Sequence, residues 1–203
     1  EVARVLFGAD PSTKGTISLN GKVVKIKSPA DAVKQGIGYL SEDRKQYGLL
    51  VSMDVKSNIA LATIKDYQTK SYFVSDSRIK KIATKYVDSL KIKTPSVDQE
   101  IRLLSGGNQQ KVVIAKWLQR DCDILIFDEP TRGIDVGAKG EIYKLLDELA
   151  ASGKSIIMIS SELPEVLRMS HRIVVMSEGK TTGVLSSEEA TQEKIMEYAT
   201  QLH

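Results

Sequence analysis

Residues 124–130 read ILIFDEP, and this stretch decides the fold. Its apolar run is typical of a strand that is buried on both faces of a parallel sheet. The run at 155–160, SIIMIS, has the same character, and a helix with one apolar side lies between the two runs and ends at Gly153. Strand, helix and strand in this order predict an α/β core with a mostly parallel sheet flanked by helices. The apolar positions of the intervening helix are Ile142, Leu145, Leu146 and Leu149.

The sequence on either side of this core predicts further elements. Asn20-Gly21 lies between two short alternating runs and is the strongest two-residue signal for an antiparallel hairpin. From about residue 53 to 90 the pattern is helical, interrupted by the polar stretch KDYQTKSYFVSDS at 65–77, which we interpret as a loop. Shorter helices are expected from Pro29 to Gly36, after Ser105, at Leu163–Met169 and near the C-terminus, and strands at Ile37–Leu40, Ile173–Met176 and from Gly179 to Leu185.

Composition excludes several classes of protein. The 203 residues carry a net charge of +3, but their 29 basic residues are scattered among 26 acidic ones, so we expect no groove for nucleic acid. The single cysteine, Cys122, excludes an internal disulfide and a cysteine-rich metal site, and beside an aliphatic strand it is expected to be a buried packing residue. No apolar run approaches the roughly 20 residues of a membrane-spanning helix.

Two adjacent carboxylates, Asp128 and Glu129, end the decisive strand. The carboxyl edge of a parallel sheet is where such folds bind ligands. One carboxylate can hold Mg²⁺ while the next, pointing elsewhere by strand alternation, can orient a nucleophilic water. An acidic turn before Pro130 without any catalytic role explains the same residues, and this stretch alone does not decide between the two interpretations.

A second motif, LSGGNQQ at residues 104–110, predicts the start of a helix. Ser105 is a good N-cap, and Gly106 and Gly107 let the backbone approach a ligand without obstruction by a Cβ atom. A helix N-terminus with free amides and no acidic neighbour is a phosphate site. An ordinary capped helix is the alternative explanation of this motif.

The two motifs together, in this order and at this spacing, resemble the nucleotide-binding domain of ABC transporters. LSGGNQQ is similar to the family's signature motif and ILIFDE to its magnesium-binding strand. The stretch RGID at 132–135 stands where the family has a short loop facing the partner domain, and HRIVVMSEGK at 171–180 resembles its closing strands. A narrower resemblance, to the second ATP-binding domain of tandem importers of ribose, galactose or xylose, is carried by LSEDRKQYGL, LSGGNQQK, DEPTRGIDVGAK and ISSELPEV.

The resemblance implies a P-loop NTPase-like ABC ATPase domain over residues 1–203, truncated at its N-terminus. It implies a helical subdomain at 53–121 that ends in the signature helix, an α/β core at 122–203, and ATP and Mg²⁺ as cofactors. Glu129 would be catalytic, and Asp128 and Glu42 would hold the metal. The nucleotide contacts implied are Ser105, Gly106, Gly107, Asn108, Gln109, Asp135 and Ser161.

Three departures from the family pattern predict an impaired nucleotide pocket. The chain starts partway along a helix, at Glu1, where the family has just completed its phosphate loop, so we expect a fragment with a weak hold on ATP. Glu42 stands where the family has glutamine, and a carboxylate near a triphosphate is unfavourable. Ser161 stands where a histidine contacts the γ-phosphate. The signature stretch has no such departure, and in this family it caps the ATP held by the other domain.

The resemblance also implies the partners. These are the N-terminal ATP-binding domain of the same polypeptide, integral membrane permease subunits received near residues 42–50 and the helical insertion, and indirectly an extracytoplasmic sugar-binding protein, at the cytoplasmic face of the inner membrane. Two other functions remain open: a regulatory or scaffolding module without turnover, and a soluble ABC protein of DNA repair or translation. Against the latter stand the lack of long coiled-coil insertions and of a basic face.

Overall fold

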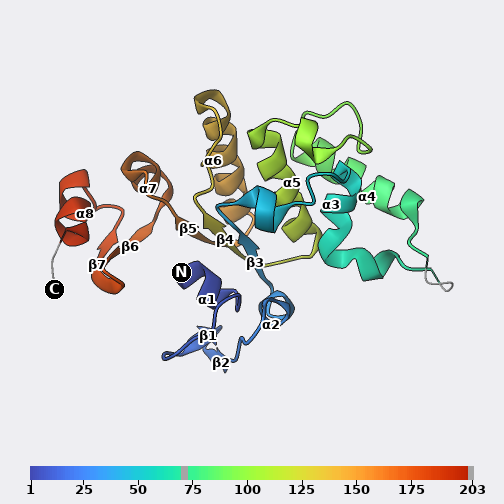
Figure 1. The fold of residues 1–203 in the computed structure, drawn as a ribbon. Coiled ribbons are helices and arrows are strands. Elements are labelled where there is room, and N and C mark those ends of the chain that lie inside the picture. Colours follow the sequence, from blue (N-terminus) through green and yellow to red (C-terminus); the bar gives the residue numbers. More distant parts are fainter. Residues whose placement is uncertain (70–72, 201–203) are drawn as a thin grey trace. The chain divides into compact units, whose positions relative to one another are not determined.

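The computed structural model describes residues 1–69 and 73–200 and is shown in Figure 1. The chain forms two compact units, Glu1–Ile157 and Met158–His203, and each is described by itself. No helix within the described ranges is long and apolar enough to cross a membrane.

The first unit is built on a sheet of order β3-β4-β5, whose last strand ends two residues beyond the unit's boundary at Ile157. Its strands are β3 (Ile37–Leu40), β4 (Ile124–Asp128) and β5 (Ser155–Ile159). β3 and β4 are parallel, with Ile37 opposite Ile124 and Leu40 opposite Phe127. Leu125, Ile126 and Phe127 are at most 1% exposed, because the strand is covered on both faces. The prediction from ILIFDEP is confirmed, and with it the α/β class.

β5 differs from the expectation of a strand buried on both faces. Ser155 and Ile157 are exposed, Ile157 by 40%, whereas the alternating residues Ile156 and Met158 are partly buried. An aliphatic run shows that a strand can be buried, but burial itself requires a layer of structure on each face. In the residues described here, β5 is covered on one face only.

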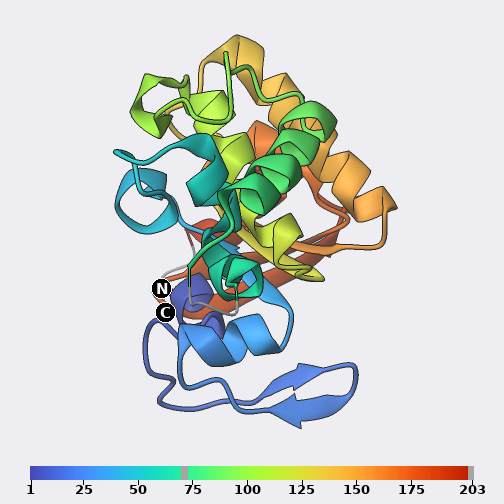
Figure 2. The ribbon, with the colours of Figure 1, turned by 90° about the vertical axis from the view of Figure 1, so that its right-hand side faces the viewer.

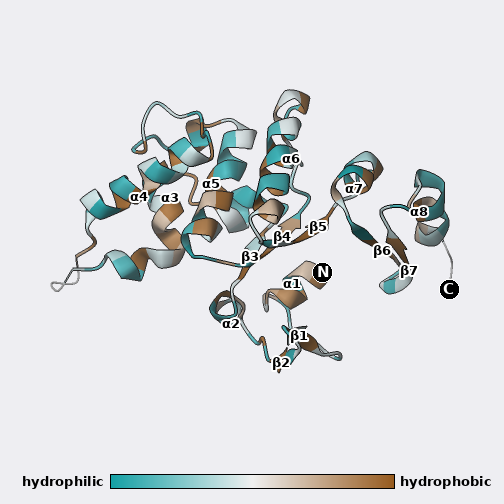
Figure 3. Cartoon of the chain, turned by 180° about the vertical axis from the view of Figure 1, so that it is seen from behind, coloured by the Kyte–Doolittle hydropathy of each residue, from teal (hydrophilic) through white to brown (hydrophobic). Residues whose placement is uncertain are grey.

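A helical region occupies residues 55–119 of the first unit. It contains α3 (Val55–Ala60), a 3₁₀ segment η2 (Leu61–Tyr67), α4 (Asp76–Ser89), a short 3₁₀ turn η3 (Ile101–Leu103) and α5 (Gly106–Gln119). The buried residues of α4 are Ile79 and Ala83, and the helix is mostly hydrophilic in Figure 3. The predicted loop at 65–77 includes the end of η2 and the start of α4, and its residues 70–72 lie outside the described residues.

The remaining elements of the first unit are short, except for α6. α1 (Val2–Leu6) and α2 (Pro29–Lys34) flank the antiparallel hairpin of β1 (Ile17–Leu19) and β2 (Lys22–Val24). Asn20 and Gly21 at its turn both have positive φ, as a two-residue hairpin turn requires. Figures 1 and 2 place this hairpin at the opposite end of the unit from α6 (Val136–Ala151). The four predicted apolar positions of α6 are all buried.

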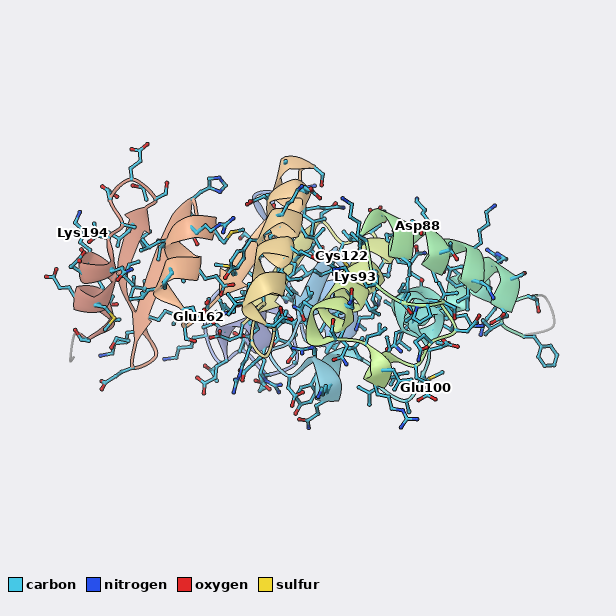
Figure 4. All side chains as sticks on the ribbon, turned by 90° about the horizontal axis from the view of Figure 1, so that it is seen from above. Asp88, Lys93, Glu100, Cys122, Glu162 and Lys194 are labelled. Atoms are coloured by element: carbon cyan, nitrogen blue, oxygen red, sulfur yellow. The ribbon has the colours of Figure 1, made fainter. Side chains whose placement is uncertain are left out.

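Cys122 follows α5 and lies within the body of the first unit (Figure 4). The side chain is fully buried, and burial raises the pKa of its thiol to about 11. A thiol with so high a pKa is almost entirely protonated and unreactive at neutral pH. The predicted role as a packing residue is confirmed.

The second unit is a small α/β unit with its own core. α7 (Leu163–Met169) precedes the antiparallel pair of β6 (Arg172–Ser177) and β7 (Lys180–Ser186), and α8 (Gln192–Ala199) follows. Each of these elements lies where the sequence predicts it. The core consists of Ile173, Val175, Leu185 and Ile195.

Candidate functional site

The carboxyl end of β4 carries the two adjacent carboxylates, and Asp128 is held by a hydrogen bond from the neighbouring strand. Tyr39 of β3 donates its hydroxyl to Oδ2 of Asp128 at 2.8 Å. Burial and this hydrogen bond raise the pKa of Tyr39 to about 12. The indole Nε1 of Trp117 donates to the Tyr39 carbonyl at 2.9 Å. The position of the Asp128 carboxylate is therefore fixed through β3 and α5.

Glu129 has an unusual backbone conformation. Its φ is +49°, in the left-handed region that residues other than glycine rarely adopt. A turn closed by the N–H of Arg132, which donates to the Glu129 carbonyl at 3.1 Å, keeps it there. Strained backbone of this kind costs on the order of 1–3 kcal/mol and is concentrated at functional sites. The strain supports the functional interpretation of this carboxylate over the interpretation as an ordinary acidic turn.

The tip of α5 begins as the sequence predicts, with Ser105 as its N-cap. The Ser105 hydroxyl does not accept a hydrogen bond from a backbone N–H of the first turn; its Oγ accepts from Nδ2 of Asn108 at 2.9 Å. Oδ1 of Asn108 in turn accepts from the N–H of Lys93 at 2.8 Å. A hydroxyl that accepts in this way keeps its own O–H to donate to a ligand. The first amides of the helix, those of Gly106, Gly107 and Asn108, have no carbonyl of α5 as acceptor.

The two glycines of the tip allow close packing within the first unit. A Cβ atom on Gly106 would lie 2.7 Å from Nη2 of Arg44 and 2.8 Å from the carbonyl oxygen of Gly133. One on Gly107 would lie 3.2 Å from Cβ of Ala138. The sequence predicts these glycines for the approach of a ligand. The structure adds that Gly106 lets the tip of α5 lie against the loop at 129–135, and Gly107 lets it lie against the start of α6.

Gln109 points away from the open side of the tip. Its side chain is 4% exposed, and Nε2 donates to the carbonyls of Ile101 and Leu104 at 3.2 and 3.1 Å. In this arrangement the amide holds the loop that precedes the helix. A direct contact between Gln109 and a phosphate would require both hydrogen bonds to break.

The residues expected to hold magnesium differ in how well they fit the ion. Mg²⁺ is usually bound by one or two carboxylates together with waters and substrate phosphates. Asp128 fits, since it lies at the strand end and its second oxygen is not needed by Tyr39. Glu42 fits poorly, because its carboxylate forms an ion pair with Arg132. No group of three or more His, Cys, Asp or Glu residues that could hold a metal occurs within residues 1–69 and 73–200.

Two further residues, Asp135 and Ser161, were expected to contact the nucleotide. Asp135 is the N-cap of α6, and its Oδ1 accepts from the N–H of Ala138 at 2.9 Å. Ser161 is an exposed residue of the second unit, just after β5. The structure thus brings Ser105–Gln109 against the loop at 129–135 and pairs Glu42 with Arg132. Ser161 belongs to the second unit.

Sequence reasoning assigned no function to Tyr39 and Arg44, although both take part in the site. Tyr39 is opposite Ile126 in the parallel register and reaches the strand end two residues further along. The resulting hydrogen bond links residues that are 89 positions apart, so it cannot be read from local periodicity. Arg44 lies within the stretch LSEDRKQYGL, so its sequence context was noted, but nothing in that context shows that its guanidinium reaches α5.

Comparison with known proteins gives a consistent result. The family model described as ABC transporter matches residues 1–132. A protein of Burkholderia lata with the provisional name ribose/galactose/methyl galactoside import ATP-binding protein 1 is 66% identical over 99% of this chain. The ribose import ATP-binding protein RbsA of Clostridium tetani is 53% identical over 98%. The chain spans 39% of the length of each of these relatives.

Solved structures agree on the fold. A nucleotide-free ATP-binding cassette from an ABC transporter aligns with a TM-score of 0.81 and 21% identity, covering 99% of this chain and 83% of that one. The ADP conformation of another such cassette gives a TM-score of 0.79 and 23% identity, covering 97% and 81%. At this level of identity the likeness establishes the fold alone.

Proposed function

Because this chain belongs to the ABC transporter family, we propose that it is an ATP-binding part of a monosaccharide importer, within a polypeptide longer than the 203 residues described. In that protein, ATP binding and hydrolysis would drive sugar uptake. The names of the relatives support a sugar of the ribose or galactose type.

The observation that carries the proposal is the tip of α5. A serine hydroxyl with an O–H to donate, the amides of Gly106 and Gly107 without an acceptor in α5, and the positive end of the helix dipole lie together at the start of this helix. Donors arranged in advance stabilise negative charge without reorganisation, and this suits a transferring γ-phosphoryl group. We propose that this phosphate belongs to ATP held by the N-terminal ATP-binding domain of the same polypeptide.

The chain's own nucleotide pocket would contribute less to turnover. Glu42 brings a carboxylate toward the place where the family has a neutral amide, and Ser161 replaces an imidazole that can carry charge. Asp128 would be the protein ligand of Mg²⁺ when the ion is bound with nucleotide, and the ion would neutralise charge on the phosphates. Glu129 would orient water there, but with fewer supporting groups.

The partners follow from this function. Residues 42–50 would receive the integral membrane permease subunits, which place the protein at the cytoplasmic face of the inner membrane as a peripheral component. An extracytoplasmic sugar-binding protein would act through the permease. The closing and reopening of the ATP-binding pair would be the mechanical step.

The test is steady-state ATP hydrolysis by the full-length protein with its permease. Ser105→Ala removes one phosphate donor, and losing one such donor costs roughly 10²-fold in kcat. Glu129→Gln should cost much less than the equivalent change in the N-terminal domain, where losing a general base costs about 10²–10⁴-fold. Ser89→Ala, which removes an exposed hydroxyl at the end of α4, is the matched control. Equal losses from Glu129→Gln and from the equivalent change in the N-terminal domain would contradict the asymmetry.

A further inference from the structure

Arg44 is anchored at its backbone before its side chain reaches the site. It is the first residue of η1 (Arg44–Gly48), a single π-helical turn whose N-cap is Asp43. Oδ1 of Asp43 accepts from the N–H groups of Lys45 and Gln46 at 3.2 and 3.1 Å. The Asp43 carboxylate therefore fixes the start of this turn.

The other end of η1 is fixed to the body of α5. Nζ of Lys116 donates to the Gly48 carbonyl at 2.7 Å. A Cβ atom on Gly48 would lie 3.3 Å from Cβ of Arg44 and 3.4 Å from Cγ2 of Val113. The turn lies close along α5, so the base of the Arg44 side chain is held at a set place on that helix.

From this base the guanidinium contacts two segments that are far apart in the sequence, the first turn of α5 and the loop at 129–135. Nη1 donates to the carbonyl of Arg132 at 2.9 Å, and Nε donates to Oε1 of Gln109 at 3.4 Å. Nη2 lies 2.7 Å from the position that a Cβ atom on Gly106 would take, and the Gly133 carbonyl oxygen lies 2.8 Å from the same position. One planar group thus touches the start of α5, the side chain that holds the loop before it, and the loop at 129–135.

In the absence of an anion, the position of the Arg44 guanidinium at the start of α5 has an energetic cost. A cation beside a helix N-terminus opposes the helix dipole. Burial lowers the pKa of Arg44, and only the attraction of Asp43 works in the other direction. The arrangement becomes favourable when negative charge arrives at the tip, and the proposed γ-phosphate supplies that charge.

We propose that Arg44 is a positioning residue that sets the tip of α5 against the loop at 129–135 and thereby aims the amides of Gly106 and Gly107 at the phosphate. It acts through these groups and does not itself contact the nucleotide. The proposal rests on the proposed function, because the tip matters to catalysis only if it serves a phosphate. A displacement of about 1 Å from a catalytic arrangement can cost roughly 10²-fold in rate.

The test compares Arg44→Ala and Arg44→Lys in the full-length protein with its permease. Because the nucleotide is held by the other domain, Arg44→Ala should lower kcat about 10- to 100-fold while KM for ATP changes less than about threefold. Arg44→Lys keeps the charge and one donor for the Arg132 carbonyl but cannot also reach Gln109, so it should recover part of kcat. Amide hydrogen exchange at Gly106 and Gly107 should rise in Arg44→Ala and return partway in Arg44→Lys. Arg172→Ala, which removes an exposed guanidinium from β6, should leave kcat unchanged.

The outcomes separate this proposal from the proposed function. If Ser105→Ala abolishes turnover and Arg44→Ala does not lower kcat, Arg44 has no positioning role and the proposed function stands. If Ser105→Ala does not lower kcat, the proposed function itself is contradicted, and with it the role of Arg44 that rests on it. If Arg44→Ala does not fold, Arg44→Lys decides: full activity with unchanged amide exchange overturns the proposal, and reduced kcat with faster exchange supports it.

Discussion

At the scale of single residues, Oδ2 of Asp128 accepts a hydrogen bond from the Tyr39 hydroxyl at 2.8 Å. The adjacent carboxylates of Asp128 and Glu129 can be placed at a strand end from the run of apolar residues before them. The partner of Asp128 cannot, because Tyr39 reaches it only through the register of two parallel strands. In the same way, LSGGNQQ predicts where α5 starts but not that Gln109 turns inward to two carbonyls. Side-chain partners depend on tertiary packing, which local patterns do not contain.

The hydrogen bond between Tyr39 and Asp128 leads to a prediction about stability. Tyr39→Phe removes a donor to a charged acceptor while keeping the ring that packs against Phe7. Hydrogen bonds to charged groups contribute about 1.5–3 kcal/mol, so the free energy of unfolding should fall by that order in urea titration. Tyr47→Phe, at an exposed tyrosine that is 61% accessible, should change it little. Equal effects of the two changes would show that the Asp128 contact contributes nothing.

The two glycines at the tip lead to a second prediction at this scale. Gly106→Ala forces its Cβ against the Gly133 carbonyl, which is backbone and cannot move aside cheaply. Gly107→Ala meets only the methyl group of Ala138 at 3.2 Å, where a shift of a few tenths of an ångström suffices. Overpacking typically costs about 1–3 kcal/mol, so thermal unfolding should show the larger loss for Gly106→Ala. The reverse order would mean that the tip does not lie on this loop.

Among the elements, α5 connects η1, α6 and the carboxyl end of β4. All of its residues from Gln109 to Trp117 are buried, including two lysines. Lys111 is paired with Glu141 of α6 at 2.8 Å, whereas Lys116 has the Gly48 carbonyl and the face of Trp117, 4.9 Å from the ring centroid. The helix therefore links η1, α6 and the strand end. The motif LSGGNQQ predicts where this helix starts but not its burial, which requires layers from distant parts of the chain.

The buried lysine of α5 makes stability depend on pH. Burial lowers the pKa of Lys116 from 10.5 to about 8. The folded protein then releases this proton at lower pH than the unfolded chain, so stability rises with pH between those two values. Lys116→Met has no titrating amine at this position. The free energy of unfolding of the wild type relative to this variant should therefore rise by about 2 kcal/mol between pH 7 and pH 10. Urea titrations of both proteins across that range measure the difference, and a constant difference would contradict the burial of a charged amine.

The cap of α6 leads to a prediction that separates the capping role of Asp135 from a role of its charge in ATP hydrolysis. Asp135→Ala loses the hydrogen bond to the Ala138 N–H, and such a loss costs about 1 kcal/mol of stability. Asp135→Asn keeps a capping oxygen and should preserve stability. If Asp135→Asn nevertheless lowers ATP hydrolysis in the full-length protein, the charge has a role beyond capping. Unchanged hydrolysis would leave Asp135 as a helix cap.

For the whole molecule, the sequence predicted the α/β class and the elements on both sides of the core. The aliphatic runs of β4 and β5 were both identified, yet only β4 is buried on both faces, because β5 lacks a second covering layer in the described residues. The central functional claim also lies at this scale. A chain that spans 39% of its relatives would complete a catalytic site whose nucleotide is held by another part of the same protein.

The most direct measurement is a structure of the full-length protein bound to a non-hydrolysable ATP analogue. We expect Oγ of Ser105 and the amide nitrogens of Gly106 and Gly107 to lie within about 3.2 Å of the γ-phosphate oxygens of the nucleotide held by the N-terminal domain. A closed, nucleotide-bound pair in which the start of α5 faces no phosphoryl group would contradict this expectation.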